Sequence, residues 1–503
     1  MTTWILLISF AVLLTRSTGI LHNSISLDAW FEETTARFKR PVYIISILST
    51  LATLILFFTP SINKDQEAYN LPYQTNDYPN IILIIVDALT AEDMSLFGYD
   101  ISTTPNLEKV TQTWSKYANA QTPSTCSIGV YPSLITGHYF YTLRPYCDYG
   151  SRIRTSDDWV DLFQILDNCG YETWWSGYLS PGFYHTGAGL DNAFAMRFGT
   201  SLMNSWFQIR GVKNHRSFPY IPISFQIRDH LTHANLDGDL LEATMNLFKQ
   251  NSFDYPFFLY VHYGGVHGVP YPSGHYLGSI LPIEEGLLDR TGQSIVLGEY
   301  KPNQQFIADK QRLRYDEAIR YQDVRLKDLI NTIKEADLYD SSMIIITADH
   351  GQVFNNGFTT HCTPLVSYTE THVPLLIKYP FQAQGEMITS LVSTIDIMPT
   401  ILDILGIPYM PDWFDGISLL EIDESQQTKR SVYTRTSTEG DFYLAVTQDQ
   451  YKITLRANEY FLFDYKNDPA EKENLIPVLG ADHEIVHNLM QALEQYIAKI
   501  EQY

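Results

Sequence analysis

Cysteine is scarce in this sequence, and basic residues are outnumbered. The chain has 4 cysteines among 503 residues, and no two of them form a CxxC pair. This argues against a zinc finger or a thioredoxin-type redox site, and so few cysteines cannot form the framework of a fold this large. The 34 Lys and Arg residues stand against 57 Asp and Glu, which gives a net charge of −23. An excess of acidic charge this large argues against binding to nucleic-acid backbones.

Hydrophobic residues make up 45% of the chain and charged residues 18%, which is typical of a folded protein with a large core. The length suggests about two to four domains' worth of chain. We expect a membrane anchor over 1–60, a linker over 61–78, a main domain over 79–430, and a smaller C-terminal subdomain with a terminal helix over 431–503.

The expected anchor depends on two apolar runs near the N-terminus. Residues 41–59 carry no charge, and as a helix they would be about 28 Å long, close to the thickness of the bilayer core. Residues 4–15 are shorter and predict the end of a longer spanning helix, a tilted first span or a signal peptide, although the start MTTW lacks the basic residues of a usual signal peptide. Basic residues between the two runs indicate a cytoplasmic loop, so the rest of the chain is predicted to be extracytoplasmic. These basic residues are Arg16, Arg37, Lys39 and Arg40.

Three apolar, largely β-branched runs predict buried strands over 80–88, 257–263 and 343–350. Residues 309–336 show helical apolar spacing with a charged opposite face. Strands that alternate with helices predict an α/β fold, with a mostly parallel sheet sandwiched by helices. After residue 430, four short strand-like pieces predict a small antiparallel subdomain: SVYTRT, FYLAVTQ, YKITLR and FLFDY.

Charged or imidazole side chains stand where each of the three predicted strands ends. They are Asp87 on the first, His262 on the second, and Asp349 with His350 on the third. Ligands of open parallel sheets bind at the carboxyl ends of the strands, and carboxylates and imidazoles are ligands for divalent ions. His267 follows nearby in the glycine-rich turn HYGGVHG, where small residues let the backbone approach a ligand closely.

Several segments, in this order from about residue 79 to about 477, resemble the sulfatase-like branch of the alkaline phosphatase superfamily. Sulfatases and phosphoethanolamine or phosphoglycerol transferases share this pattern. The matching segments are NIILIIVDALTAEDMSLFGYD with TTPNL, TPSTCSIGVYPSLITG, VHYGGVHG, IITADHGQ, STIDIMPTILDILGIP and FLFDYKNDPAEKENL.

The resemblance implies a metal-bound nucleophile at the start of a helix, ten residues before the glycine of an LxTG-like element. In LITG this glycine is Gly137, so the implied nucleophile is Ser127, with Thr125 as second candidate. Sulfatases have C/S-x-P-x-R here and oxidise the first residue to formylglycine, whereas this chain lacks both the Pro and the Arg. The implied nucleophile is therefore an unmodified hydroxyl, as in the transferases. Cys126 is expected to be a small buried residue.

The resemblance also implies the metal ligands. Asp87, Ser127, Asp349 and His350 match ligand positions, while Ala88 stands where sulfatases have a second Asp. The histidines expected to contact substrate or a second metal ion, with His267 also counted as catalytic, are His262, His267, His361 and His372. Carboxylates and imidazoles together favour Zn or Mn, and accept Ca or Mg less readily.

The sequence thus predicts a membrane-anchored, extracytoplasmic metalloenzyme that cleaves or transfers a phosphate-type ester through a covalent serine intermediate. Its expected partners are a phosphate- or sulfate-ester substrate, such as a lipid or an envelope polymer, and the membrane, but no nucleic acid. Two alternatives stay open: a sulfatase or phosphodiesterase that uses water, and a catalytically dead binding module. Outside the cytoplasm the four cysteines could form two disulfides in three ways.

Overall fold

The computed structural model describes residues 78–139, 160–177, 192–196, 206–210, 236–250, 253, 256–267, 276–283, 298–410, 412–422, 430–436 and 443–501. All of them lie in one compact unit, Ala68–Tyr503. The predicted spans over 4–15 and 41–59 fall outside the described residues. Within the described part of the chain, no helix is both long and apolar enough to cross a membrane.

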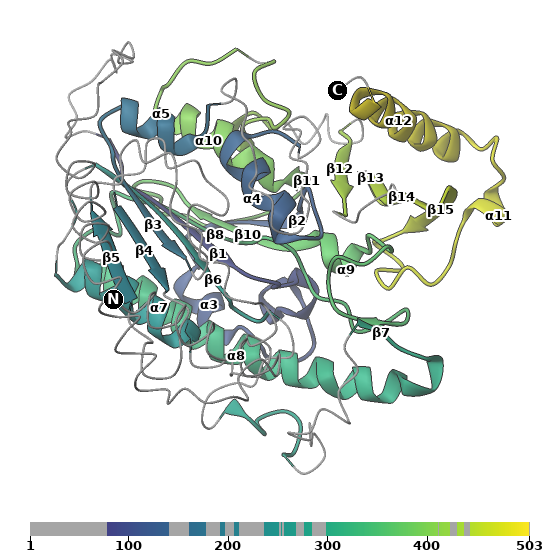
Figure 1. Ribbon diagram of the computed structural model, residues 1–503, viewed down its shortest axis with the longest axis horizontal. Coiled ribbons are helices and arrows are strands. Elements are labelled where there is room, and N and C mark those ends of the chain that lie inside the picture. Colours follow the sequence, from purple (N-terminus) through teal and green to yellow (C-terminus); the bar gives the residue numbers. More distant parts are fainter. Residues whose placement is uncertain are drawn as a thin grey trace, which may run out of the picture. The chain divides into compact units, whose positions relative to one another are not determined.

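The main sheet has nine strands in the order β11-β2-β10-β8-β1-β6-β3-β4-β5 (Figure 1). The three strands predicted from apolar runs are its central neighbours β8 (Met343–Ala348), β1 (Ile81–Val86) and β6 (Phe257–Tyr263), which pair in parallel. Every residue of these three strands is buried, which is why their sequences are continuously apolar. The flanking strands are β11 (Glu386–Ser393), β2 (Ser115–Gln121), β10 (His372–Lys378), β3 (Glu172–Gly177), β4 (Asn192–Met196) and β5 (Trp206–Arg210).

The sheet is mostly parallel, as predicted, but two strands are reversed: β10 runs antiparallel to β2 and β8, and β5 runs antiparallel to β4. The chain between β8 and β10 contains one short helix, α9 (Tyr368–Thr371), and no crossover helix. A parallel return needs such a crossover. Strand β10 therefore starts at the edge where β8 ends and runs back beside it.

Helices cover both faces of the sheet, and alternate residues of β1 belong to two separate cores. Ile81, Leu83 and Ile85 pack on the side of α4 (Ser127–Thr136), α5 (Leu162–Asn168) and α10 (Ile397–Ile404). Ile82, Ile84 and Val86 pack on the side of α3 (Pro105–Val110), α7 (Leu236–Lys249) and α8 (Gln305–Glu335). Figure 1 shows these two helical layers above and below the strands. The helix predicted over 309–336 is thus confirmed as α8.

The predicted C-terminal strands form a four-stranded antiparallel sheet, β12 (Val432–Arg435), β13 (Leu444–Gln448), β14 (Tyr451–Arg456) and β15 (Glu459–Asp464). Helix α12 (Glu484–Glu501) packs on this sheet through its own apolar cluster. The remaining short elements are β7 (Gly298–Glu299), β9 (Phe358–Thr359), α11 (Ile476–Leu479) and the 3-10 helices at Ala91–Asp93, Ser95–Phe97, Pro302–Gln304, Thr394–Asp396 and Leu419–Glu421.

A buried ion-pair network attaches the C-terminal sheet to the main domain. Lys452 Nζ on β14 lies 2.8 Å from Glu471 Oε1 and also donates to the carbonyl of Val366. The same carboxylate accepts from Tyr368 N at 3.0 Å and from Arg456 Nη2 at 3.1 Å. Burial lowers the pKa of Lys452, and Glu471 opposes this effect. A carboxylate that serves this many donors cannot be removed without leaving buried charge behind.

We expect Glu471→Ala to lower the free energy of unfolding by about 3–5 kcal/mol, because it leaves the buried Lys452 ammonium without its carboxylate. Lys466→Ala is the matched control: it breaks an exposed pair with Asp449 at 3.8 Å, which should matter by less than about 1 kcal/mol. Urea unfolding of the two variants measures both effects. Equal small losses would show that the network does not hold the subdomain.

Candidate active site

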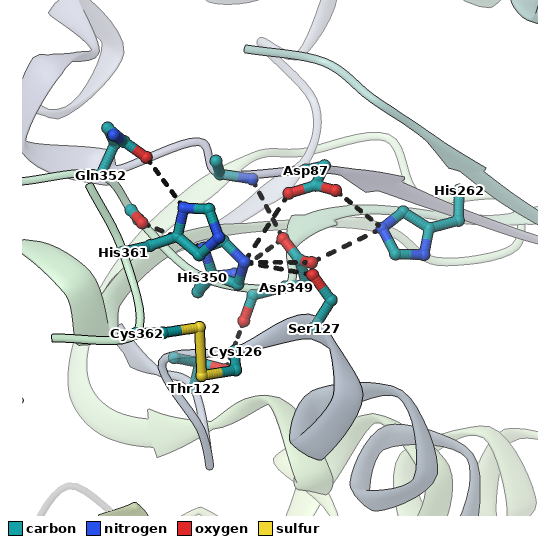
Figure 2. Close-up of polar contacts among 12 residues, drawn as sticks. Asp87, Thr122, Cys126, Ser127, His262, Asp349, His350, Gln352, His361 and Cys362 are labelled. Carbon is teal, nitrogen blue, oxygen red and sulfur yellow. Dashed lines mark hydrogen bonds and ion pairs between the residues drawn. A yellow bond between two sulfur atoms is a disulfide. The ribbon is translucent and has the colours of Figure 1, made fainter. Parts of the chain in front are cut away.

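The ends of β1, β6 and β8 bring four predicted residues to one point at the edge of the sheet (Figure 2). One ligand atom each from Asp87, His262 and Asp349 lie within 4.8 Å of one another. His350 Nε2 joins them, 3.7 Å from Asp87 Oδ1 and 3.5 Å from Asp349 Oδ2. None of the four residues is more than 2% exposed. The structure therefore assembles two carboxylates and two imidazoles in a nearly water-free site.

Backbone donors fix the orientation of Asp349. Its Oδ1 accepts from Ala88 N at 3.0 Å and from His350 N at 2.9 Å. Its Oδ2 accepts no hydrogen bond and faces the Nε2 atoms of His262 and His350, at 3.6 and 3.5 Å. Burial alone would raise the pKa of Asp349, but His350, His262 and the backbone donor hold it well below its ordinary value. The residue thus presents one charged, unsatisfied oxygen to the centre of the cluster.

The spacing of the four side chains fits a shared divalent cation. Their nitrogen–oxygen distances of 3.5–3.9 Å are longer than hydrogen bonds. Two ligands of one ion, each about 2.1 Å from it at tetrahedral angles, lie about 3.4 Å apart. His350 Nδ1 lies 3.0 Å from Gly351 O, so Nδ1 carries the proton and Nε2 keeps the lone pair that a metal needs.

The turn after β1 that carries Asp87 is held from two sides. Ala88 adopts a left-handed φ of 62°, which is costly for a residue with a Cβ. On one side, Tyr315 OH on α8 donates to Ala88 O at 2.6 Å and accepts from Thr90 N at 3.0 Å. On the other side lies Gly265, with a φ of 53°, where a Cβ would sit 2.9 Å from Asp87 O. The close approach at this glycine is to the backbone of the Asp87 turn.

Ser127 is the first residue of α4, and its Oγ lies 3.2 Å from His350 Nε2. The side chain is partly exposed, so a substrate can reach it. The positive end of a helix dipole also stabilises charge that develops on a nucleophile here. Thr125, the second candidate, is fully buried. The geometry therefore favours Ser127.

His361 lies beside both His350 and His267. The ring of His361 stacks on His350 with centroids 4.3 Å apart and lies 4.7 Å from the ring of His267. Its Nδ1 lies 3.2 Å from Gln352 Oε1, which makes Nδ1 the donor and leaves the lone pair on Nε2. Desolvation and the neighbouring imidazoles hold the pKa of His361 well below its ordinary value. His267, His350 and His361 thus form one wall of the site, the histidine wall.

His372 does not join this wall. Its Nδ1 lies 2.8 Å from Glu92 Oε1 and its Nε2 lies 2.9 Å from Ala118 O. Burial raises the pKa of Glu92, but the hydrogen bond to His372 and the charges of His372 and Arg312 together outweigh burial, and the net shift of the pKa is downward. Both ring nitrogens face acceptors, so they are not available to a substrate or a second ion. The geometry thus opposes the predicted role of His372 and gives the residue a structural one.

A disulfide joins Cys126 to Cys362, with their Cα atoms 5.1 Å apart. Cys126 is therefore more than the small buried residue that its position suggested. Cys169 is a buried free thiol, and Cys147 lies outside the described residues.

Three supporting residues, Thr122, Gln352 and Tyr315, were missed by the sequence reasoning. Thr122 Oγ1 donates to the carbonyl of Asp349, while Gln352 and Tyr315 make the contacts described above. Such roles depend on contacts across the fold, and no motif or spacing in the sequence marks them.

Comparisons with known proteins identify the family of this chain. The family model "Sulfatase" matches residues 79–407. The chain belongs to the sulfatase family. This membership makes it a hydrolase of the alkaline phosphatase superfamily. A second family model, "N-sulphoglucosamine sulphohydrolase, C-terminal", matches residues 365–499.

Two curated relatives and one solved structure each match most of the length of this chain. Choline-sulfatase of Rhizobium meliloti is 23% identical over 80% of this chain and 83% of its own length. Human arylsulfatase A is 23% identical over 82% of this chain and 86% of its own. The solved structure of a phosphonate monoester hydrolase from Agrobacterium radiobacter has a TM-score of 0.59 at 16% identity, and covers 84% of this chain and 96% of that one. This structure shows the shared fold.

Asp349→Ala should reduce metal affinity at least about 100-fold, because it removes the oxygen that faces both imidazoles. His487→Ala, an exposed histidine on α12, is the control and should leave metal content unchanged. Plasma mass spectrometry of the purified full chain after dialysis measures both. Unchanged metal in the Asp349 variant would show that the ligand set is wrong.

Tyr315→Phe should weaken metal binding about 10- to 100-fold, because the turn that carries Asp87 loses its anchor. Tyr171→Phe is a matched control, since Tyr171 OH donates to Pro79 O at 2.9 Å, before β1 begins. Each variant should lose about 1–3 kcal/mol of stability, but metal titration should change only for Tyr315. Equal metal affinities in the two variants would contradict the anchoring role.

Proposed function

We propose that this sulfatase-family enzyme cleaves or transfers a phosphate-type ester through a covalent intermediate on an unmodified Ser127. The observation that supports this most directly is the position of the Ser127 hydroxyl, 3.2 Å from His350 in a cluster suited to a divalent ion. Such a constellation is typical of metal-assisted nucleophilic catalysis.

The segment that follows Ser127 supports a hydroxyl rather than formylglycine. In the sulfatase motif C/S-x-P-x-R, which begins here at Ser127, Gly129 stands in place of the Pro and Tyr131 in place of the Arg. Tyr131 is 1% exposed and packs edge-on against Trp175 and Tyr260, with ring centroids 5.1 and 5.5 Å away. The position of the motif arginine is thus filled by a core residue, and no signal for oxidation of Ser127 is left.

In the proposed reaction, Ser127 Oγ forms a bond to phosphorus while the ester P–O bond breaks, and the serine proton ends on the departing alcohol. Water or an acceptor alcohol then attacks phosphorus and restores the serine hydroxyl. Asp87, His262, Asp349 and His350 would hold the ion, whose chemistry here is to stabilise negative charge. The chain's own helix start orients Ser127, and His267 and His361 stand where they can contact the ester oxygens.

The comparisons favour a second candidate, hydrolysis of a sulfate ester. The relatives include a choline-sulfatase and an arylsulfatase. One solved structure of similar fold was determined with D-glucosamine-2-N,6-O-disulfate. A carbohydrate sulfate is therefore the alternative substrate class, and it would require water as the acceptor.

The proposed location is the outer side of a membrane. The apolar run over 41–59 predicts an anchor, and its basic flank predicts which side the enzyme faces. The Cys126–Cys362 disulfide supports an oxidising compartment, because disulfides are rare in the cytosol. An anchored enzyme at that position would meet lipid head groups or envelope polymers.

Ser127→Ala should lower turnover of an aryl phosphodiester at least about 1,000-fold with the fold intact, because it removes the attacking oxygen. Thr125→Val is the control and should keep most activity, since its hydroxyl is buried. The first measurement is the rate of hydrolysis of aryl phosphodiesters, phosphonates and sulfates. The second is the mass of the Ser127 peptide from wild-type enzyme trapped with its substrate.

The adduct mass distinguishes the two candidates. A phosphate-ester adduct on Ser127 supports the proposal, whereas a Ser127 peptide two hydrogens lighter than expected would show formylglycine and favour the sulfatase. Full activity in Ser127→Ala would remove Ser127 from the reaction. A metal-free protein without any turnover would instead indicate a binding module.

A further inference from the structure

The disulfide lies inside the active site and links its two halves. Cys126 is the N-cap residue of α4, directly before Ser127. Cys362 directly follows His361, and 236 positions separate the two cysteines in the sequence. Figure 2 shows the sulfur bridge beside Ser127 and below the stacked rings of His350 and His361. One covalent link therefore ties the nucleophile to the histidine wall.

We propose that the Cys126–Cys362 disulfide is a positioning element of the active site, so that the reaction proposed above depends on oxidising conditions. Alongside the bridge, the same two segments share a backbone hydrogen bond, from Cys362 N to Thr125 O at 3.1 Å. We expect this single bond to hold the helix start less firmly against His361 than the bond and the bridge do together. A displacement of about 1 Å at a reacting group can cost about 100-fold in rate.

The metal ligands do not depend on the bridge. Asp87, His262 and Asp349 with His350 stand at the ends of β1, β6 and β8, which the sheet holds in register. The loop after Cys362 also has its own support, because the Glu370 carboxylate accepts from the backbone and hydroxyl groups of Thr363 and Ser367. Opening the bridge should therefore loosen the link between Ser127 and His361 while the metal centre and the loop persist.

The bridge is accessible from one side. Cys126 is 6% exposed, whereas Cys362 is partly exposed. A trialkylphosphine can attack the Cys362 sulfur and break the S–S bond. Water then releases the sulfur as a thiol and the phosphine leaves as its oxide, so that both cysteines gain a proton. This reductant is suitable because it opens the bridge without adding a metal-binding thiol.

The experiment compares the oxidised full chain with the reduced chain, the double variant Cys126→Ala/Cys362→Ala, and Cys169→Ala as control for the buried thiol. Peptide mass mapping verifies the bridge, and plasma mass spectrometry verifies the metal. On an aryl phosphodiester, kcat should fall about 10- to 100-fold on reduction, with KM changed less than about threefold. Reoxidation should restore kcat. The kcat of the double variant should equal that of the reduced enzyme and should not change when the reductant is added.

Hydrogen exchange provides a readout that does not need activity. Peptides over 122–130 and 358–363 should exchange faster after reduction, while those of β1, β6 and β8 should not. A reduced chain that keeps its kcat and its exchange pattern overturns the inference, and so does loss of metal in parallel with kcat. If the oxidised enzyme has no turnover, the proposed function fails, and the exchange pattern alone decides the positioning role.

Discussion

The site depends on two buried carboxylates, Asp87 and Asp349, which both face the imidazoles of His262 and His350. Moving ionised groups out of water costs several kcal/mol each unless the charge is paired. Asp349 has one oxygen bound by two backbone donors and one that accepts none. A divalent cation would satisfy that oxygen together with Asp87. The left-handed Ala88, the close approach of Gly265 and the bonds of Tyr315 all serve to hold these groups in place.

The change from the usual sulfatase pattern has an electrostatic consequence. Ala88 removes a carboxylate, and His262 supplies a neutral nitrogen from the neighbouring strand. A divalent ion between two carboxylates makes a centre of about zero net charge, whereas a third carboxylate would make it negative. A neutral centre repels an anionic ester less. It also explains how a chain with a net charge of −23 can accept an anionic substrate, because the electrostatic field at the site, and not the net charge of the chain, determines whether the anion binds.

The sequence was most informative where the chemistry is local. Continuous apolar runs predicted β1, β6 and β8, and the charged or imidazole residue near the end of each run predicted the cluster at their ends. His372 was misleading because its partner Glu92 lies 280 positions away, and only the pairing of distant segments shows that both ring nitrogens are engaged. The direction of β10 and the pairing of Cys126 with Cys362 depend on tertiary contacts in the same way.

The C-terminal subdomain matters more to the site than its sequence indicated. The segment before Ser127 is bound from three directions. Thr434 Oγ1 on β12 donates to Thr122 O at 2.7 Å, and Thr125 N donates to Arg435 O at 3.2 Å. Thr122 also binds the carbonyl of Asp349, and Cys126 is bridged to Cys362. Ser127, the proposed nucleophile, thus stands where the sheet edge with the candidate metal ligands, the loop that carries His361 and the C-terminal sheet meet. Its position therefore depends on how well all three are assembled.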